Sequence, residues 1–409
     1  MLRYDVIVIG LGALGSAATY QLSRRGAVVL GIDRFSPPHK FGSSHGETRI
    51  TRMAVGEGAE YTPLALRSRA LWRAIEKEDA LDGGSSSQVP LFQQCGCLTI
   101  SGPNDMVRQG VEGFFQNIRY SARKYDIPFE EFGLGKEIRD RFPQFAVEAN
   151  DRGFLDLWGG FLRPEECIAT QLRLATKHKA TIRLNAKVTA IRNSKTGVAV
   201  AVESGEEFEG ARLLIAAGPW LPTFLPGPLR SRFVVTRQVL HWFEVKSHPE
   251  RFSVKNCPVF IWDLNGRKLS HTEQMPKAMI YGFPSTDSGT EGLKVTHEEI
   301  GSVTTPDDVS REVKPNEISE LYDTYIKAFM PDVGPRSIRT EVCLYTNTKG
   351  ARFVIDRHPD YPRAIFASAC SGHGFKHSAA LGEALAETLM DQPSSEVDLT
   401  PFTIRKLGA

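Results

Sequence analysis

Two segments of this chain gather ionisable side chains next to glycines, a combination that can do chemistry. His45-Gly46-Glu47-Thr48-Arg49, with Arg52 soon after, lies in a long polar stretch. The second segment, Ser371 to His377, carries Lys376 and leads from two glycines directly into an apolar helical pattern. A helix start presents unpaired backbone N–H groups and a partial positive charge, so it can stabilise negative charge that develops during a reaction.

A third segment, Glu341 to Thr346, has the pattern of a strand in which Cys343 and Tyr345 point to the same face. Each of the three segments also has an ordinary structural interpretation: a solvated loop, a glycine-rich helix start, and a cysteine of the core. Considered one at a time, none of them decides between chemistry and structure.

The N-terminal residues predict a nucleotide-binding βαβ unit that could position such a site. The strand-like run Asp5 to Ile9 leads into a glycine-rich turn, and the next apolar strand, Ala27 to Ile32, ends on Asp33. In this motif the glycines permit a tight turn, close approach of a pyrophosphate, and packing of a helix, expected here from about Ser16, on the strand. Asp33 would then hold a ribose hydroxyl; an ordinary glycine-rich turn is the alternative. The three motif glycines are Gly10, Gly12 and Gly15.

Composition indicates a globular protein of more than one domain. At about 150 residues per domain, a length of 409 residues suggests two or three domains, and we expect two. The net charge of +2 gives no footprint for nucleic acid or an anionic membrane. No leader precedes the first strand and no apolar run reaches the ~20 residues of a membrane span, so we expect a soluble, cytoplasmic protein, monomeric or weakly dimeric.

The six cysteines form neither a disulfide framework nor a zinc framework. Cys95 and Cys97 are the only close pair, and one intervening residue is too few for a zinc knuckle. We therefore expect no metal site.

The order of patterns predicts two interleaved domains of the α/β class. One domain is expected from residues 1–88, 151–224 and 335–409, and the other from residues 89–150 and 225–334. Apolar periodicity predicts helices over residues 61–77, 165–179 and 306–329, and a helix fed by the glycine turn within 371–391. Strands are expected at 181–188 and at 213–218, the latter a buried parallel strand.

These segments together resemble the monomeric sarcosine oxidase family, the flavin amine oxidases that include N-methyltryptophan, pipecolate and fructosyl-amino-acid oxidases. The resemblance spans nearly the whole chain, and SHGETR and SGHGFK are highly specific in combination. It rests on GLGALG, SHGETRITR, GEGAEYTPLALRS, YGF at 281–283, GLK at 292–294, CLYTNT at 343–348, FVIDRHP at 353–359 and SGHGFKHS at 371–378. The family fold it implies is a doubly wound, Rossmann-like FAD-binding domain interleaved with a mixed-sheet α+β substrate domain.

The resemblance implies how the cofactor is held. Cys343 matches the cysteine whose sulfur is covalently attached to the FAD ring, and His45 and Arg49 match basic residues that lie over one face of the flavin. Lys294 matches the lysine that activates dioxygen on that side. Further cofactor contacts are expected from Gly10, Gly12, Gly15, Asp33, Ser44, Thr48, Gly372, His373, Gly374 and Lys376.

The resemblance also implies a substrate site. Arg52 and Lys376 match the cations that hold the substrate carboxylate, and Tyr281 and Tyr345 match aromatic walls of the substrate cavity. His297 is expected to bind substrate, although relatives place this histidine four residues after the lysine rather than three. A polar insertion between residues 262 and 281 is a second departure from the family pattern. The altered histidine spacing and this insertion both favour a substrate bulkier than sarcosine.

The expected reaction is FAD-dependent oxidation of a secondary amine of an amino acid to the imine, with oxygen reduced to hydrogen peroxide. The substrate would be an N-methyl or N-alkyl amino acid, or a cyclic imino acid such as pipecolate or proline. Only the unprotonated amine has the lone pair that drives hydride loss, and cations such as Arg49 and Lys294 would favour that form.

Three alternatives share these cofactor motifs. A fructosyl-amino-acid oxidase stays within the family. An amino-acid dehydrogenase with another electron acceptor is disfavoured by Lys294, and a non-catalytic FAD- or NAD-binding protein is disfavoured by the convergence of Arg52, Lys376 and Tyr281.

Overall fold

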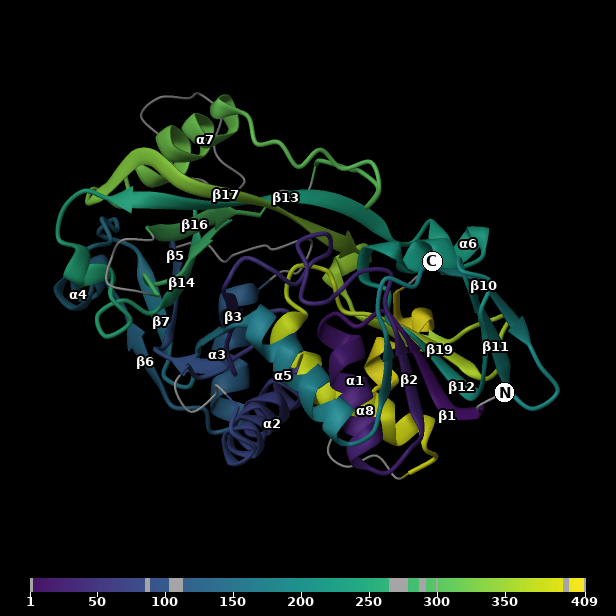
Figure 1. Ribbon diagram of the computed structural model, residues 1–409. Helices are drawn as coiled ribbons and strands as arrows, with labels where there is room; N and C mark the ends of the chain where they lie inside the picture. The colour runs from purple at the N-terminus through teal and green to yellow at the C-terminus, as the bar shows by residue number, and fades with distance from the viewer. Residues whose placement is uncertain are drawn as a thin grey trace.

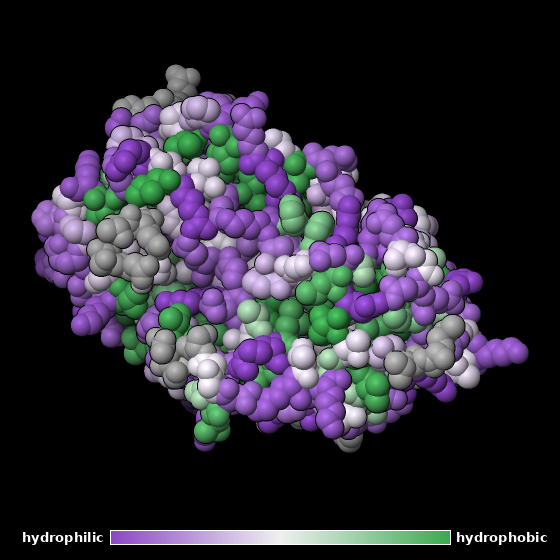
Figure 2. Space-filling model, in the orientation of Figure 1, coloured by the Kyte–Doolittle hydropathy of each residue, from purple (hydrophilic) through white to green (hydrophobic). Residues whose placement is uncertain are grey.

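The computed structural model describes residues 3–84, 89–102, 113–264, 279–286, 292–298, 301–392 and 397–407. Two large sheets lie side by side, and a group of helices packs below and between them (Figure 1). The predicted α/β class with a second, mixed sheet is confirmed. On the face seen in Figure 2 hydrophilic residues dominate, and hydrophobic residues form separate small groups. In the described part of the chain, no helix is both long enough and apolar enough to cross a membrane.

The first sheet is built around parallel strands from distant parts of the sequence. β1 lies between β2 and β12 and runs parallel to both, and β19 runs parallel to β12. Alternate residues of β1 belong to two different buried clusters, so both faces of this strand are covered. The strands are β1 (Arg3–Ile9), β2 (Val29–Ile32), β9 (Thr181–Arg183), β10 (Val188–Asn193), β11 (Val198–Val202), β12 (Glu207–Ile215), β18 (Val354–Arg357) and β19 (Ala364–Ser368).

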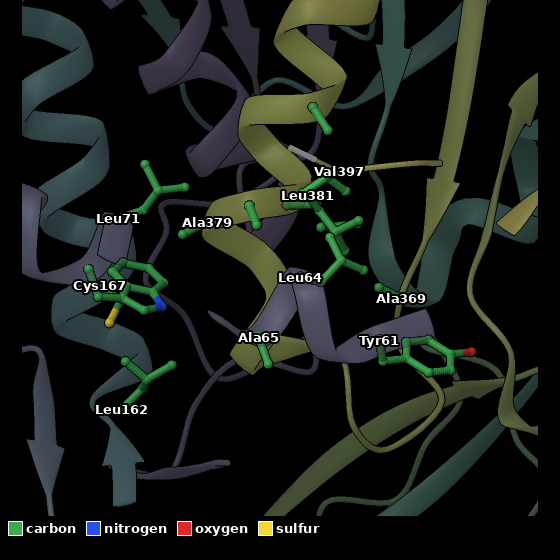
Figure 3. Packing of buried hydrophobic residues seen from close by; sticks show 14 of the residues in the cluster. Tyr61, Leu64, Ala65, Leu71, Leu162, Cys167, Ala369, Ala379, Leu381 and Val397 are labelled. Carbon is green, nitrogen blue, oxygen red and sulfur yellow. The ribbon is translucent and has the colours of Figure 1, made fainter. Parts of the chain in front are cut away.

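Long helices cover one side of this sheet. α1 packs against both α5 and α8, and α8 also packs against α2. Figure 3 shows this core, where Leu64 and Ala65 of α2 face Ala379 and Leu381 of α8. The helices are α1 (Ala13–Arg24), α2 (Thr62–Leu81), α5 (Pro164–Lys177) and α8 (Ser378–Leu389), with the short helices η1 (Ala59–Tyr61), η3 (Gly218–Phe224), η6 (Lys349–Ala351), η7 (Phe375–His377), η8 (Thr400–Phe402), η9 (Ile404–Leu407) and α6 (Gly227–Arg230).

The second sheet has the strand order β17-β13-β16-β15-β14-β5-β7-β6. Its long antiparallel pair, β13 and β17, runs along the top of Figure 1. The strands are β5 (Cys97–Ser101), β6 (Phe129–Phe132), β7 (Arg152–Asp156), β13 (Val234–Val245), β14 (Val259–Asp263), β15 (Met279–Gly282), β16 (Leu293–His297) and β17 (Val333–Asn347); a small sheet joins β3 (Arg49–Thr51), β4 (Phe92–Gln94) and β8 (Gly160–Leu162).

Short helices cover the second sheet. Tyr322 and Ile326 of the π-helix η5 are buried in the same cluster as Phe243 of β13 and Val295 of β16. These helices are α3 (Phe114–Lys124), α4 (Gly135–Arg141), η4 (Pro249–Phe252), α7 (Pro315–Leu321) and η5 (Tyr322–Ile326).

Several predicted elements have different bounds. The strand expected at 181–188 is two short strands, β9 and β10, and Asn185 between them has φ of 53°. The helix expected over 306–329 begins only at Pro315 and ends as the π-helix η5. α1 begins at Ala13, three residues before Ser16. The helices expected near 61–77 and 165–179 are confirmed within a few residues. The strand expected at 213–218 is parallel as predicted, but it is the end of β12, which begins at Glu207 and stops at Ile215.

Sheet membership differs from the predicted segments at two places. β7, which falls in the segment 151–224, pairs with β5 and β6 of the second sheet. β17, most of which falls in the segment 335–409, pairs with β13 over most of its length. Long-range pairing decides both cases, and residue spacing along the chain does not encode it. Residues 85–88, at the end of the first predicted segment, and most of the predicted polar insertion, at 265–278, lie outside the described residues.

The contact between α1 and α8 gives a stability prediction. A Cβ on Gly382 would lie 2.4 Å from the Ala17 side chain and 2.6 Å from its backbone carbon, so Gly382→Ala should push the helices apart. We expect destabilisation of about 1–3 kcal/mol from overpacking, measured as a lower thermal midpoint. Gly227→Ala is the control, because no atom lies within 4 Å of its added Cβ. Equal midpoints for the two variants would contradict this account of the contact.

Candidate active site

An elongated cavity of about 360 Å³ runs between the two sheets. One end lies at the turn after β1, and the other reaches β15, β16 and β17. Fifteen of the predicted site residues line it: Gly10, Gly12, Asp33, Ser44, Thr48, Arg49, Arg52, Tyr281, Lys294, Cys343, Tyr345, Gly372, His373, Gly374 and Lys376. The fold therefore brings the separate sequence segments to one place.

The glycine turn has the geometry that a pyrophosphate needs. Gly10 has φ of 86°, and a Cβ there would lie 2.5 Å from the Ala216 carbonyl oxygen. Gly12 lines the cavity at the start of α1, and nothing lies within 4 Å of where its Cβ would be. Gly15 lies outside the cavity wall, where a Cβ would be 1.7 Å from the Gly10 carbonyl oxygen. Open space at a helix N-terminus fits a phosphate.

Asp33 is held in place beside this turn. Its Oδ2 accepts a hydrogen bond of 2.7 Å from the Leu11 N–H, and its Oδ1 accepts one of 2.8 Å from the Phe35 N–H. Burial raises the pKa of Asp33, while these backbone donors favour the carboxylate. The glycine turn and Asp33 together fit the ADP part of FAD.

Three cavity residues at this end were not predicted from the sequence. Asp307 Oδ1 accepts hydrogen bonds from Arg34 at 2.7 Å and from the Trp220 indole N–H at 3.0 Å. This contact joins the segment before α7 to the nucleotide end of the cavity. Its partners are 273 and 87 residues from Asp307 in the sequence, and no local pattern signals such pairing.

The loop before β3 forms one wall at the other end. Gly46 and Glu47 have φ of 91° and 67°, and their N–H groups donate to Glu165 Oε1 at 2.6 and 3.2 Å. A carboxylate in the first turn of α5 thus fixes two consecutive left-handed residues. A Cβ on Gly46 would lie 2.5 Å from the Leu240 side chain, so this position needs glycine.

Arg49 and Cys343 meet in the cavity wall. Arg49 Nη2 lies 3.5 Å from Cys343 Sγ and donates to the Ser43 carbonyl at 2.9 Å, while Nη1 donates to the Thr48 carbonyl at 2.8 Å. The Cys343 thiol is 3.5 Å from the same Ser43 carbonyl. The guanidinium therefore fixes the sulfur between β17 and the loop.

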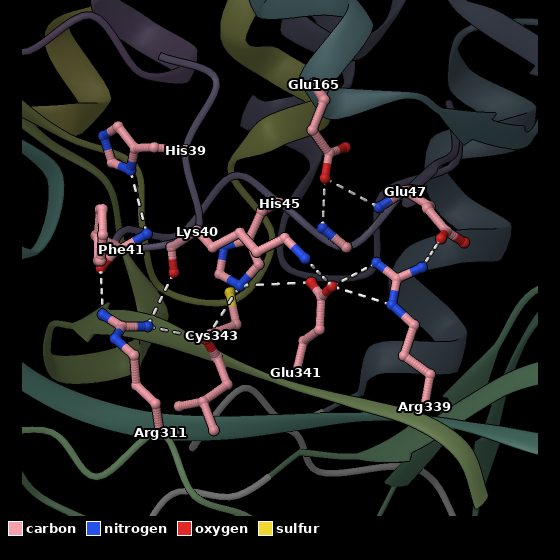
Figure 4. Close-up of polar contacts among 12 residues, drawn as sticks. His39, Lys40, Phe41, His45, Glu47, Glu165, Arg311, Arg339, Glu341 and Cys343 are labelled. Atoms are coloured by element: carbon pink, nitrogen blue, oxygen red, sulfur yellow. Dashed lines mark hydrogen bonds and ion pairs between the residues drawn. The ribbon is translucent and has the colours of Figure 1, made fainter. Parts of the chain in front are cut away.

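His45 lies behind this wall rather than in it. Its Nε2 donates to the Val342 carbonyl at 3.0 Å, and burial followed by the Arg49 charge lowers its pKa to about 3. The imidazole is therefore neutral at pH 7. Figure 4 shows it beside Glu341, which also binds Lys40 at 2.8 Å and Arg339. The predicted position of His45 over the flavin stays a prediction.

Lys294 links β16 to the same loop. Its Nζ donates to the carbonyls of Gly46 at 2.6 Å and Thr48 at 3.0 Å, and to the Thr48 hydroxyl at 3.2 Å. Burial, and then the Arg49 charge, lowers its pKa well below the usual value of 10.5. Three acceptors match the three N–H donors of an ammonium group, so the contacts favour the charged form.

Both cations that were predicted to bind the substrate carboxylate, Arg52 and Lys376, lie in the cavity wall, but they bind different protein groups. Arg52 Nη2 donates to both carboxylate oxygens of Glu57, at 2.7 and 2.8 Å, and both side chains are buried. Lys376 is buried too and donates to the His373 carbonyl at 2.6 Å. Sequence reasoning missed Glu57, which balances the Arg52 charge five residues away.

Tyr281 and Tyr345 come together from β15 and β17. Their hydroxyl oxygens are 3.1 Å apart, and both rings line the cavity. Burial is the main cause that raises both phenol pKa values, that of Tyr281 to about 12. Both hydroxyls are therefore protonated at neutral pH and can donate hydrogen bonds.

The prediction that His297 binds substrate is wrong. Its ring stacks on Tyr325 of η5 with centroids 5.4 Å apart, and it does not line the cavity. Successive residues of a strand point to opposite faces, so Leu293, Val295 and His297 share the face opposite Lys294. His297, three residues after Lys294, therefore lies on the side of the sheet opposite the lysine. The residue four positions after Lys294 is Glu298.

Comparison with known proteins agrees with this geometry. Residues 5–388 match the model of the family described as FAD dependent oxidoreductase. The chain is 34% identical over 407 residues to monomeric sarcosine oxidase of Streptomyces avermitilis, covering 99% of this chain and 98% of that protein. It is 34% identical over 410 residues to N-methyl-L-tryptophan oxidase of Yersinia pestis, covering 98% and 99% of the two chains.

A solved structure shows the same fold. The open form of NikD, an amino acid oxidase essential for nikkomycin biosynthesis, superposes with a TM-score of 0.79 at 21% identity, covering 98% of both chains. The match to the family model over residues 5–388 and the full-length matches to two relatives at 34% identity identify the family, and the cavity geometry agrees with them. The chain therefore belongs to the FAD dependent oxidoreductase family.

Proposed function

We propose that this protein oxidises the secondary amine of an amino acid, with FAD attached to Cys343 and molecular oxygen as the electron acceptor. The observation that supports it best is the meeting of Cys343, Arg49 and Lys294 at one end of a cavity whose other end fits ADP. The relatives named for sarcosine and N-methyl-L-tryptophan favour an N-methyl or N-alkyl amino acid. A cyclic imino acid is the other substrate of this class.

Bound FAD supplies the hydride acceptor, and oxygen takes the electrons from it as hydrogen peroxide. The residues of the chain prepare the substrate for this step. Arg49 and Lys294 place positive charge at the reactive end, which lowers the pKa of a bound amine and so favours the neutral form that can lose a hydride. Both cations are fixed by backbone carbonyls, so they need no rearrangement when substrate binds.

We assign the substrate carboxylate mainly to Lys376. Arg52 Nη2 donates to both carboxylate oxygens of Glu57, and Lys376 donates to the His373 carbonyl. Both cations line the cavity, and the Glu57 carboxylate reduces the positive charge that Arg52 offers to an entering anion. The same entry excludes water around the amine, which strengthens every charge interaction there.

The first prediction concerns the covalent bond. Cys343→Ser should leave FAD extractable by acid precipitation, while flavin should remain with the denatured wild-type chain, because the substitution removes the sulfur atom that we propose bonds the flavin. Cys370→Ser is the matched control, since Cys370 also lines the cavity. In-gel flavin fluorescence reads the outcome, and flavin that still migrates with the Cys343→Ser chain would assign the bond to another residue.

The second prediction concerns oxygen. Lys294→Met should slow reoxidation of the reduced enzyme far more than its anaerobic reduction by substrate, because a fixed positive charge stabilises the anion formed from oxygen. Lys294 carries its charge only below its lowered pKa, so wild-type reoxidation should slow as pH rises through a value well below 10.5. The variant should lack this pH dependence.

Stopped-flow absorbance measures both half-reactions, with Lys376→Met as the comparison variant because it should affect reduction instead. Equal slowing of reduction and reoxidation in Lys294→Met would remove the oxygen-specific role. Reduction by amines without reoxidation by air in the wild type would favour a dehydrogenase.

The third prediction concerns the carboxylate. Lys376→Met should reduce the preference for an N-methyl amino acid over its carboxamide by about ten- to a hundredfold, the cost of one charged hydrogen bond. The ratio of kcat/KM values measures it, and exposed Lys246→Met serves as the control. An unchanged ratio would mean that Lys376 does not contact the carboxylate.

A further inference from the structure

Trp242 lies between two cations that belong to neighbouring strands. In the strand order β17-β13-β16, Trp242 of β13 pairs directly with Lys294 of β16 on one side and with Arg339 of β17 on the other. Directly opposed residues project from the same face of a sheet, and here it is the face from which Lys294 lines the cavity. The strand register therefore places one indole between two positive charges.

Both cations lie over the indole ring. Lys294 Nζ is 5.2 Å from the ring centroid, and Arg339 Cζ is 4.5 Å from it. Lys294 Nζ also lies 4.6 Å from the centroid of the Phe283 ring, which lines the cavity. The face of an aromatic ring attracts a cation within about 6 Å, and more strongly where water is excluded. The Lys294 ammonium thus has two ring faces in addition to its three hydrogen-bond acceptors.

The indole and the second cation are themselves held by carboxylates. Trp242 is buried, and its Nε1–H donates to Glu47 Oε2 at 3.2 Å. Glu47 also binds Arg339, and Arg339 Nε donates to Glu341 at 3.0 Å (Figure 4). The carboxylates therefore fix the edge of the ring and the guanidinium, while carbonyls, a hydroxyl and ring faces hold Lys294.

The charges around Lys294 act on its ammonium in both directions. Burial, and then the Arg49 charge, lowers the pKa of Lys294, whereas the nearby carboxylates act to raise it. Each contact that favours the ammonium then sets how far up the pH scale the charge persists. The titratable and charged groups that face Lys294 from neighbouring elements are Arg49, Glu165, Glu341, Cys343 and the neutral His45, with Arg339 beyond the indole.

We propose that Trp242 is a positioning residue that keeps Lys294 charged at the reactive end of the cavity, by presenting a ring face to the ammonium and by separating it from the Arg339 guanidinium. The inference rests on the proposed role of Lys294 in the reaction with oxygen and deepens it. In Trp242→Leu, strands about 10 Å apart would carry the two cations with only an aliphatic side chain between them. The change removes one attraction and strengthens one repulsion, and both make the ammonium more acidic.

NMR can follow the protonation of Lys294 in the holoenzyme without turnover. In protein labelled with ¹³C at lysine Cε, the Lys294 signal is identified by its loss in Lys294→Met, and its pH titration gives the acid dissociation constant of the ammonium. Trp242→Leu should raise this constant about tenfold, as for a desolvated cation–π contact, and Trp242→Phe should raise it much less because a ring remains. Trp158→Leu is the control, since Trp158 carries Arg69 over its ring at 4.6 Å but does not line the cavity, and it should leave the titration unchanged.

Fluorinated tryptophan tests the ring face without removing the side chain, and so does not depend on the folding of Trp242→Leu. Fluorine withdraws electron density from the indole and weakens its attraction for a cation. Incorporation of 5-fluorotryptophan throughout the wild type should raise the dissociation constant of Lys294 roughly twofold. The same labelling of Trp242→Phe, which keeps every other tryptophan, should leave the constant unchanged. An equal change in both chains, or none in the wild type, would overturn the proposal.

Stopped-flow reoxidation separates this inference from the proposed function. In Trp242→Leu, reoxidation should begin to slow at a lower pH than in the wild type, in step with the NMR titration. If the titration moves and the pH profile of reoxidation does not, the oxygen role of Lys294 fails while the inference about Trp242 stands. If Trp242→Leu and the wild type share one dissociation constant, or if wild-type Lys294 is already neutral at pH 7, the inference about Trp242 is wrong whatever the rate of reoxidation.

Discussion

The buried Lys294 ammonium ties the second sheet to the loop that follows the first βαβ unit. Burying a cation is costly unless hydrogen bonds replace its water, and Lys294 finds three acceptors on Gly46 and Thr48. Glu165 holds the loop that carries these acceptors in its left-handed conformation. The same loop sets Arg49 against Cys343, so one set of contacts positions Lys294, Arg49 and Cys343.

Charge is distributed unevenly along this cavity. The ADP end relies on backbone N–H groups and on Asp33, while the reactive end relies on Arg49 and Lys294, which donate to backbone carbonyls. Carbonyl dipoles hold a cation without cancelling its charge, whereas the Glu57 carboxylate largely cancels that of Arg52. The difference separates cations that can act on a bound molecule from one that mainly completes the wall.

Local patterns in the sequence predicted the parts of the site that backbone geometry imposes. The glycine turn, Asp33 and the helix after Gly374 depend on short-range spacing, and the structure has them where expected. Partners distant in the chain were not predictable in this way: Glu165 under the loop, Asp307 over the nucleotide end, and the pairing of β17 with β13. The role assigned to His297 failed for a different reason, since a change of one residue in a strand moves a side chain to the opposite face.

That sensitivity to strand position applies to Lys294 as well. Lys294 cannot shift along β16, because its ammonium would lose the Gly46 and Thr48 carbonyls and remain buried without them. The position of Lys294 in the strand is therefore fixed by the same loop that sets Arg49 against Cys343.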